Sequence, residues 1–361
     1  MDLASVNSDR RRYVGSLYGL AAAVLFGVST PLSKLLLPSV TPLMLAALLY
    51  LGAGIGVSLF RVTELSPARK SSEARLRRSD FALLGAIIMF GGVIGPVLML
   101  AGLSRISALA GSLLLNLEAV FTILIAVVIF GEHLSSASAL ASGLVVFGAL
   151  MMSYDSGPVG GDLPGVLAVA GACLSWAVEN NLSQRLSLRN PYAVVQVKAL
   201  GAAACTIALA LATGNWAGSP APMLGALLLG SLSYGVSLVC VMQALRYLGA
   251  AREAAWFSTA PFVGAVLSIA IFGTLPRSSD IVAASLMIAG VMLLLRERHS
   301  HLHAHETLEH DHAHLHDEHH QHAHDSPVPG VHSHPHRHDP ITHDHPHVSE
   351  VHHRHPHTDG S

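Results

Sequence analysis

Long apolar runs alternate with short polar breaks along this chain, and the pattern predicts a protein that crosses a membrane many times. About 20 apolar residues, rising 1.5 Å each in a helix, cover the hydrocarbon core of a bilayer. Ten runs approach or exceed that length. The expected spans are 15–37, 42–60, 81–102, 107–130, 134–154, 164–184, 192–213, 222–245, 253–274 and 279–296. The predicted fold class is therefore an all-α polytopic membrane protein with ten transmembrane helices.

Composition supports this class, since 51% of the residues are hydrophobic and only 12% are charged. Soluble domains carry about 25% charged residues. The three cysteines, Cys173, Cys205 and Cys240, all fall inside apolar runs, so no disulfide framework is expected. No cleavable signal peptide is evident, because the first apolar run is too long for one. The lipid bilayer is the expected environment, and nothing indicates a nucleic-acid partner.

Lysine and arginine in the connections predict the orientation, because cytoplasmic loops are enriched in them. Fifteen of these residues fall on the side of the N-terminus, and only Arg105 and Arg277 fall on the other. Both termini are therefore expected in the cytoplasm, in a bacterial-type inner membrane.

A weak internal echo predicts that the spans form two related halves. The triplets Phe130–Glu132 and Phe272–Thr274 each close an apolar run, and the same shift of 142 residues overlays Gly148 on Gly290. Five is an odd number of spans, so the two halves would be inverted relative to each other, a common plan for transporters. The expected organisation is 1–14 as a cytoplasmic N-terminus, 15–154 and 164–296 as five-helix repeats, and 297–361 as a disordered cytoplasmic tail.

Three stretches resemble the EamA-type members of the drug/metabolite transporter superfamily. They read LLLNLEAVFT and FGEHL in 113–134, FGVSTPLSKLLL in 26–37, and WAVENNLSQRLSLRNPYAVVQVKAL in 176–200. The resemblance covers about 15–296. It implies secondary carriers or exporters of small solutes that work by alternating access, and it fixes no substrate. Thr274 stands where members often carry an acid, which departs from symmetry between the halves.

Glu118 is the leading candidate for chemistry, because it lies in the middle of the fourth apolar run. A carboxylate at that depth costs at least about 2.5 kcal/mol, so it should face protein or a water-filled path. Desolvation favours its protonated form, which suits a proton or cation site. The alternative is a Glu that only ties helices together. Asn116, two residues earlier, is a weaker candidate for the same pathway.

Further pathway candidates lie at the polar interruptions of other runs. Glu179, Asn180 and Asn181 point in three directions about 100° apart, so they cannot all avoid lipid without protein neighbours. Lys34 near the outer end of the first run and Trp176 deep in the sixth complete the set. The alternatives are snorkelling for the charged residues and a local ion pair of Glu179 with Arg185.

The tail has a different chemistry, because 23 histidines occur among residues 299–357. Neutral imidazole is a good ligand for nickel, cobalt, zinc and copper(II). The tail is therefore predicted to bind these ions, although no cofactor is required. The candidate ligands are His301, His303, His305, His310, His312, His314, His316, His332, His334, His336 and His338. The alternatives are a metal buffer unrelated to the cargo, a pH-responsive tail and neutral drift.

These features favour a secondary transporter that exports a small solute, with a divalent transition metal ion or its complex as the preferred cargo and protons as the coupling ion. One alternative is a metabolite or drug carrier with a regulatory tail. Another is a membrane metal sensor that transports nothing. No nucleophile–base constellation or nucleotide-binding motif indicates an enzyme. A homodimer is compatible with the sequence, which leaves the oligomeric state open.

Overall fold

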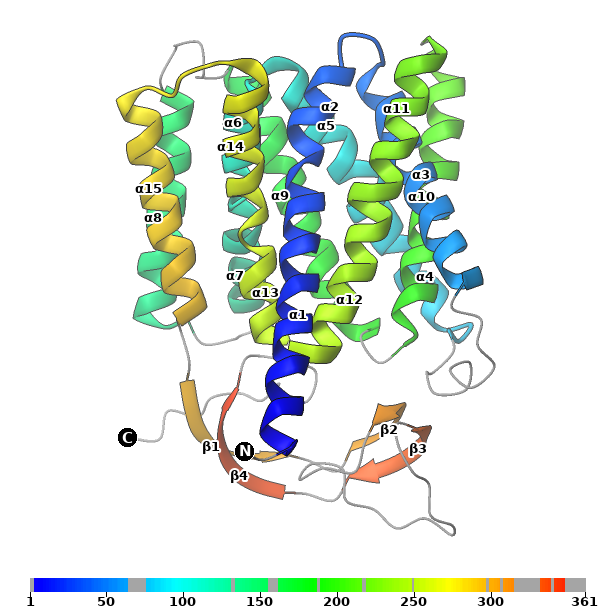
Figure 1. Ribbon diagram of the computed structural model, residues 1–361, viewed down its shortest axis with the longest axis vertical. Coiled ribbons are helices and arrows are strands. Elements are labelled where there is room, and N and C mark those ends of the chain that lie inside the picture. The colour runs from blue at the N-terminus through cyan, green and yellow to red at the C-terminus, as the bar shows by residue number, and fades with distance from the viewer. Residues whose placement is uncertain are drawn as a thin grey trace.

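The computed structural model describes most of the chain as one helical bundle with a short tail beside it (Figure 1). The described residues are 3–63, 76–130, 134–154, 162–186, 189–215, 219–248, 250–296, 299–305, 308–314, 332–338 and 341–347.

The first half of the bundle contains α1 (Leu3–Gly27), α2 (Ser29–Leu36), α3 (Pro42–Thr63), α4 (Asp80–Ile87), the π-helix η1 (Ile88–Ile94), α5 (Gly95–Arg105), α6 (Ala108–Leu114), α7 (Leu117–Phe130) and α8 (Ser136–Tyr154). The second half contains α9 (Leu163–Ser183), the 3₁₀ turn η2 (Gln184–Leu186), α10 (Pro191–Ala212), α11 (Pro220–Gly230), the π-helix η3 (Ser231–Val236), α12 (Ser237–Leu248), α13 (Ala250–Phe257), α14 (Ala260–Phe272) and α15 (Ser278–Arg296).

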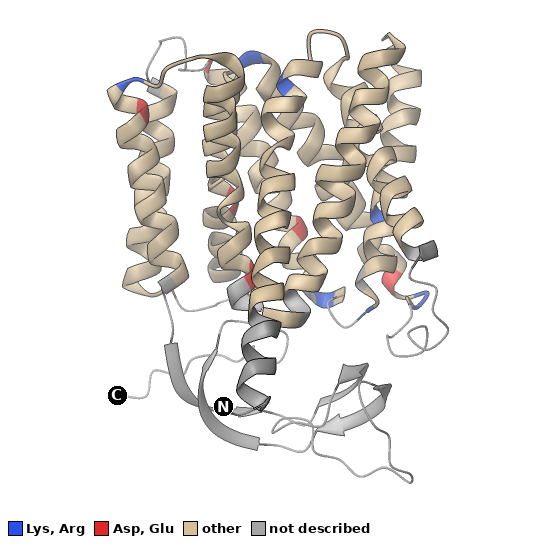
Figure 2. Cartoon of the chain, in the orientation of Figure 1, with Lys and Arg blue, Asp and Glu red and all other residues tan. Residues whose placement is uncertain are grey.

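Ten helical stretches among the described residues are long and apolar enough to cross a membrane, which confirms the prediction of an all-α polytopic fold. They match the ten expected spans to within a few residues. The start of α1 and the end of α15 lie at the same end of the bundle (Figure 1). Lysine, arginine and acidic residues lie mostly near the two ends of the bundle, and a few lie between them (Figure 2).

Several spans are interrupted, and the interruptions recur in both halves. The fourth span breaks between α6 and α7 at Leu115 and Asn116, and the ninth breaks between α13 and α14 at Ser258 and Thr259. The two breaks lie about 142 residues apart, which is the shift that the sequence echo indicates. At the second break Pro261 follows within two residues and has no N–H to continue the helix.

The third and eighth spans each contain a π-helical turn, η1 and η3, again at corresponding positions. In η1 the wider turn has a cause in the sequence. Pro96 cannot donate a backbone hydrogen bond, and its ring clashes with the carbonyl of the preceding turn. A π-turn relieves this crowding, and the Gly95 N–H then bonds the Phe90 carbonyl five residues earlier.

Helix packing follows the same two-fold pattern. α3 packs on α10, α6 on α14 and α8 on α15, while α1 on α12 is matched by α5 on α9. The α8–α15 contact is reciprocal at the residue level. A Cβ at Gly148 would lie 2.9 Å from the Ala283 carbonyl oxygen, and a Cβ at Gly290 would lie 2.7 Å from that of Ala141. Both pairs are related by the shift of 142 residues, as two copies of one five-helix unit would require.

The described part of the tail forms two antiparallel ladders. β1 (His299–His305) pairs with β4 (Ile341–His347), and β2 (Leu308–His314) pairs with β3 (His332–His338). The physical reason is the His-x-His alternation. Its period of two matches the side-chain period of a strand, so it favours extended pairing although it lacks apolar content.

Candidate functional site

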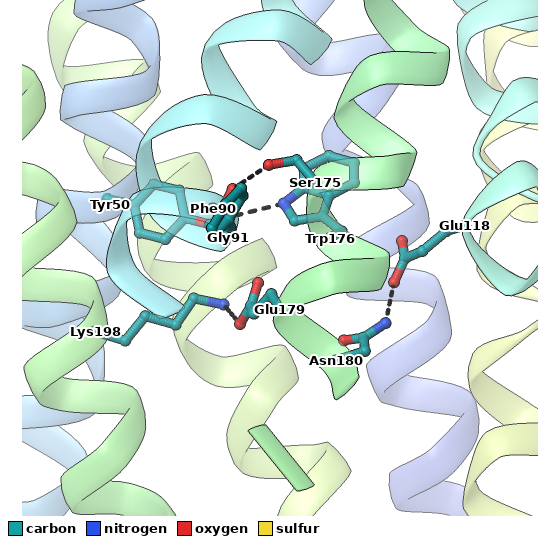
Figure 3. A network of polar contacts seen from close by, with 9 residues as sticks. All are labelled: Tyr50, Phe90, Gly91, Glu118, Ser175, Trp176, Glu179, Asn180 and Lys198. Atoms are coloured by element: carbon teal, nitrogen blue, oxygen red, sulfur yellow. Dashed lines mark hydrogen bonds and ion pairs between the residues drawn. The ribbon is translucent and has the colours of Figure 1, made fainter. Parts of the chain in front are cut away.

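The candidate site is built around α9, which carries Glu179 and Asn180 side by side. Adjacent helical residues point about 100° apart. Glu179 therefore faces α10 and η1, whereas Asn180 faces α7 (Figure 3). One turn of α9 thus joins two polar clusters whose other members come from α7 and α10.

The first cluster is Glu118 with Asn180. The Asn180 amide donates to the Glu118 Oε1 atom at 2.7 Å (Figure 3). Glu118 is the eleventh residue of the 22-residue apolar stretch 108–129, and it lies in the first turn of α7 directly after the helix break. A carboxylate there interacts favourably with the positive end of the helix dipole.

The second cluster is a buried ion pair between Glu179 and Lys198 of α10 (Figure 3). The exposed fraction of the side chain is 10% for Glu179 and 18% for Lys198. Gly91 of η1 makes room for the acid, because a Cβ at that position would overlap the Glu179 carboxylate. The position of Glu179 is therefore set by backbone contact.

The Gly91 carbonyl of η1 accepts hydrogen bonds from side chains of α3 and α9. In a π-turn its donor would be the N–H of residue 96, which is proline. Two side chains bond the carbonyl: the Tyr50 hydroxyl donates to it at 2.7 Å, and the Trp176 indole N–H donates at 3.1 Å. The Ser175 hydroxyl donates to the neighbouring Phe90 carbonyl at 2.8 Å. Hydrogen bonds from side chains of α3 and α9 thus hold η1 in place beside the Glu179–Lys198 ion pair.

The two side chains of the first cluster differ in their exposure. Asn180 is exposed and Glu118 is partly exposed, although both belong to membrane-crossing helices. Polar groups at that depth require protein or water as neighbours, since lipid cannot satisfy them. The hydrogen bond between Glu118 and Asn180 supplies each side chain with one such protein partner.

Other residues predicted for the pathway make local structural contacts. The Asn116 amide bonds the Leu113 carbonyl at 2.8 Å, which closes the end of α6. The Asn181 amide bonds the Ala177 and Thr122 carbonyls at 2.9 and 3.3 Å. These contacts tie the helix ends and α7–α9 together.

Lys34 lies at the opposite end of the bundle from the start of α1. Its ammonium group donates to the Leu103 carbonyl at 2.6 Å and to the Ser104 carbonyl at 3.2 Å. A cation at the C-terminal carbonyls of α5 complements the helix dipole. This contact gives Lys34 a helix-capping position.

Sequence reasoning did not single out Tyr50, Gly91, Ser175 or Lys198 as site residues. For the contacts at Gly91, the one signal in the sequence was Pro96. A proline has no N–H, so a carbonyl in the preceding turn lacks its backbone donor.

The candidate metal ligands are the last set of predicted site residues. The described residues contain no group of three or more His, Cys, Asp or Glu side chains that could hold a metal ion. The predicted tail ligands His301, His303, His305, His310, His312 and His314 lie in β1 and β2, and His332, His334, His336 and His338 lie in β3. His316 lies outside the described residues.

The chain belongs to the EamA-like transporter family, because the family model matches residues 13–154 and 163–296. This is a family of membrane transporters, and the protein is a multi-pass membrane protein. The two matched segments meet between α8 and α9, where the two halves of the bundle join.

Two further comparisons agree with this family. An uncharacterized transporter from Methanothermobacter thermautotrophicus strain Delta H is 29% identical over 302 residues, which are 79% of this chain and 87% of that protein. A solved crystal structure superposes with a TM-score of 0.56 at 18% identity, covering 78% of this chain and 96% of the other. At that identity the second likeness concerns the fold alone.

Proposed function

We propose that this protein is a proton-coupled secondary carrier that moves its solute by alternating access. The observation that carries the proposal is the Glu118 carboxylate, which lies in the middle of a span, at a helix break, and bonds the Asn180 amide. Broken helices near the midplane are where carriers of inverted-repeat design bind substrate and coupling ions.

The proposed cycle uses Glu118 as the group that exchanges a proton for cargo. An uncharged Glu118 returns through the low-dielectric bundle at lower cost than a carboxylate, because burial penalises the charged form. Asn180 can donate its N–H to the carboxylate and offer its carbonyl oxygen to the protonated acid. It therefore suits both states of Glu118.

The preferred cargo is a divalent transition metal ion or its complex, exported from the cytoplasm. This part of the proposal rests on the histidine-rich tail, which begins three residues after α15. Both termini are assigned to the cytoplasm, where the tail would raise the local metal concentration at the inner mouth. The lack of a three-ligand group in the described spans favours a hydrated or complexed ion.

The test is flux through the purified full-length protein in proteoliposomes. Nickel, cobalt and zinc are loaded on one side, and their appearance on the other is followed with an indicator dye. We expect flux that Glu118→Gln abolishes. Glu253→Gln serves as the matched control, because Glu253 is another buried acid in a span. Metal flux indistinguishable from that of empty liposomes would refute the metal cargo, and it would also leave the sensor alternative standing.

A second candidate is an organic metabolite carrier with a regulatory tail. It is favoured by the Glu179–Lys198 pair, which offers one charge of each sign inside the bundle, and by the scarcity of metal ligands in the described spans. Counterflow of organic solutes in the same liposomes, with indifference to metals, would select it over the metal carrier.

A further inference from the structure

The Glu179–Lys198 ion pair joins a fixed partner to a mobile one. Glu179 sits against Gly91, at a point where no side chain fits beside it, and it belongs to the same turn of α9 as Trp176. Trp176 in turn bonds the Gly91 carbonyl. Lys198 arrives from α10 on a flexible four-carbon stem. The carboxylate therefore stays in place while the ammonium can leave.

A purely structural role explains this pair poorly. Burying two charges costs several kcal/mol per ion, and apolar side chains of similar volume often stabilise a fold as well or better. The pair also lies next to the proposed transport group, because Asn180 follows Glu179 directly and bonds Glu118. The two clusters thus hold two acids, Glu118 and Glu179, and Lys198 is the one cation bonded to either of them among the described contacts.

We propose that Glu179 is the cation-binding site of the carrier and that Lys198 is a tethered competitor that occupies it when cargo is absent. This inference rests on the proposed transport function. The ligand class is a cationic group, either a hydrated divalent metal ion or an ammonium group. When such a cation enters beside Glu179, Lys198 withdraws, so the Glu179 carboxylate keeps a cationic partner with cargo or without it.

Because Lys198 is covalently attached near the site, the strength of its competition with a free cation can be calculated. A group held by a short flexible linker acts at an effective concentration in the mM range. Removing the Lys198 charge should therefore lower the apparent Kd for the cation by about tenfold or more. Removing the Glu179 charge should abolish the site. The two partners are thus predicted to act in opposite directions, whereas a structural ion pair would lose function through either one.

The experiment measures binding through Trp176, which lies three residues before Glu179 on α9. Full-length protein carrying Trp216→Phe and Trp256→Phe keeps this single tryptophan, and paramagnetic Ni²⁺ near Glu179 quenches its fluorescence. Titrations compare the parent with Lys198→Met, Lys198→Gln and Glu179→Gln. All variants keep the tail, so the quenching that remains in Glu179→Gln reports tail binding alone.

We expect tighter Ni²⁺ binding in both Lys198 variants and loss of the α9 signal in Glu179→Gln. Gln196→Met serves as the control, since Gln196 lies on the same helix and bonds Ser58 instead. Ethylammonium is added as a competitor, and displacement of Ni²⁺ by it would assign the site to ammonium groups. Lys198→Gln keeps a hydrogen-bond donor for Glu179, so it covers the case in which Lys198→Met fails to fold.

Unchanged or weaker Ni²⁺ binding in the folded Lys198 variants would overturn the inference. Recovery of thermal stability in the Glu179→Gln/Lys198→Met double variant, without any change in binding, would identify the pair as structural. Flux assays on the same proteins separate the two proposals. Binding that responds to Lys198 without flux contradicts the transport function, while flux without that response contradicts only the competitor role.

Discussion

The hydrogen bonds from Tyr50 and Trp176 to the Gly91 carbonyl lead to a prediction that can be quantified. Tyr50→Phe removes the 2.7 Å hydrogen bond from the phenol and leaves the indole N–H of Trp176 as the remaining side-chain donor. Trp176→Phe removes the other bond. Because Pro96 has no N–H, the double variant leaves a buried carbonyl without either donor.

The magnitudes follow from this count of donors. Loss of one of two bonds should cost about 0.5–1.5 kcal/mol, whereas an unsatisfied buried acceptor costs about 1–3 kcal/mol. Tyr50 is only 5% exposed, so water cannot easily replace its hydroxyl. The double variant should therefore lose more stability than the sum of the two single variants, by about 1 kcal/mol.

The assay is thermal or denaturant unfolding of the four proteins of this double-mutant cycle in one detergent. Pro96→Ala provides the control, because it restores an N–H where the carbonyl lacks a backbone donor. In that background Tyr50→Phe should cost clearly less. Equal costs of Tyr50→Phe with proline and with alanine at position 96 would refute the account of η1.

Three further predictions follow from other parts of the molecule. Gly148→Ala or Gly290→Ala should each separate α8 from α15 and cost about 1–3 kcal/mol, because the added methyl meets a backbone oxygen; unfolding measurements that show equal stability would contradict the reciprocal packing. Replacing His343 and His345, which pair in register with His303 and His301 of β1, should lower the metal stoichiometry in equilibrium dialysis; an unchanged stoichiometry would argue against metal binding by these paired histidines. Deleting 299–361 should weaken metal tolerance of a sensitive bacterium and leave residual flux in liposomes, and a complete loss of flux from a folded protein would contradict the gathering role of the tail.

The sequence predicted the spans because an apolar run of sufficient length has few alternatives to a membrane helix. Glu118 was identifiable for the same reason, since a charge in such a run is costly. The break directly before Glu118 was not predicted, because no proline or glycine marks Leu115 or Asn116. It changes the local picture, since it places the carboxylate at the start of a helix.

The partners within the site were harder to predict, because periodicity gives the depth of a residue and says little about its neighbours. Lys198 lies close enough to a span end to suggest snorkelling, yet it pairs inward with Glu179. Gly91 takes part through its backbone carbonyl, and every residue has one, so the residue type gives no signal. Only Pro96, which lacks an N–H, indicated a carbonyl without a backbone donor in the preceding turn. In the tail, the period of two in the His-x-His alternation fits the strands of the described segments.

Glu118 is proposed to exchange a proton for cargo, and simultaneous recording of proton and metal movement tests this exchange. Full-length protein in liposomes is loaded with a pH-sensitive dye and a metal indicator, and a metal gradient is imposed. We expect proton movement opposite to the metal, kept in Glu118→Asp and lost in Glu118→Gln with the fold intact. Cargo-driven proton movement that persists unchanged in Glu118→Gln would contradict it.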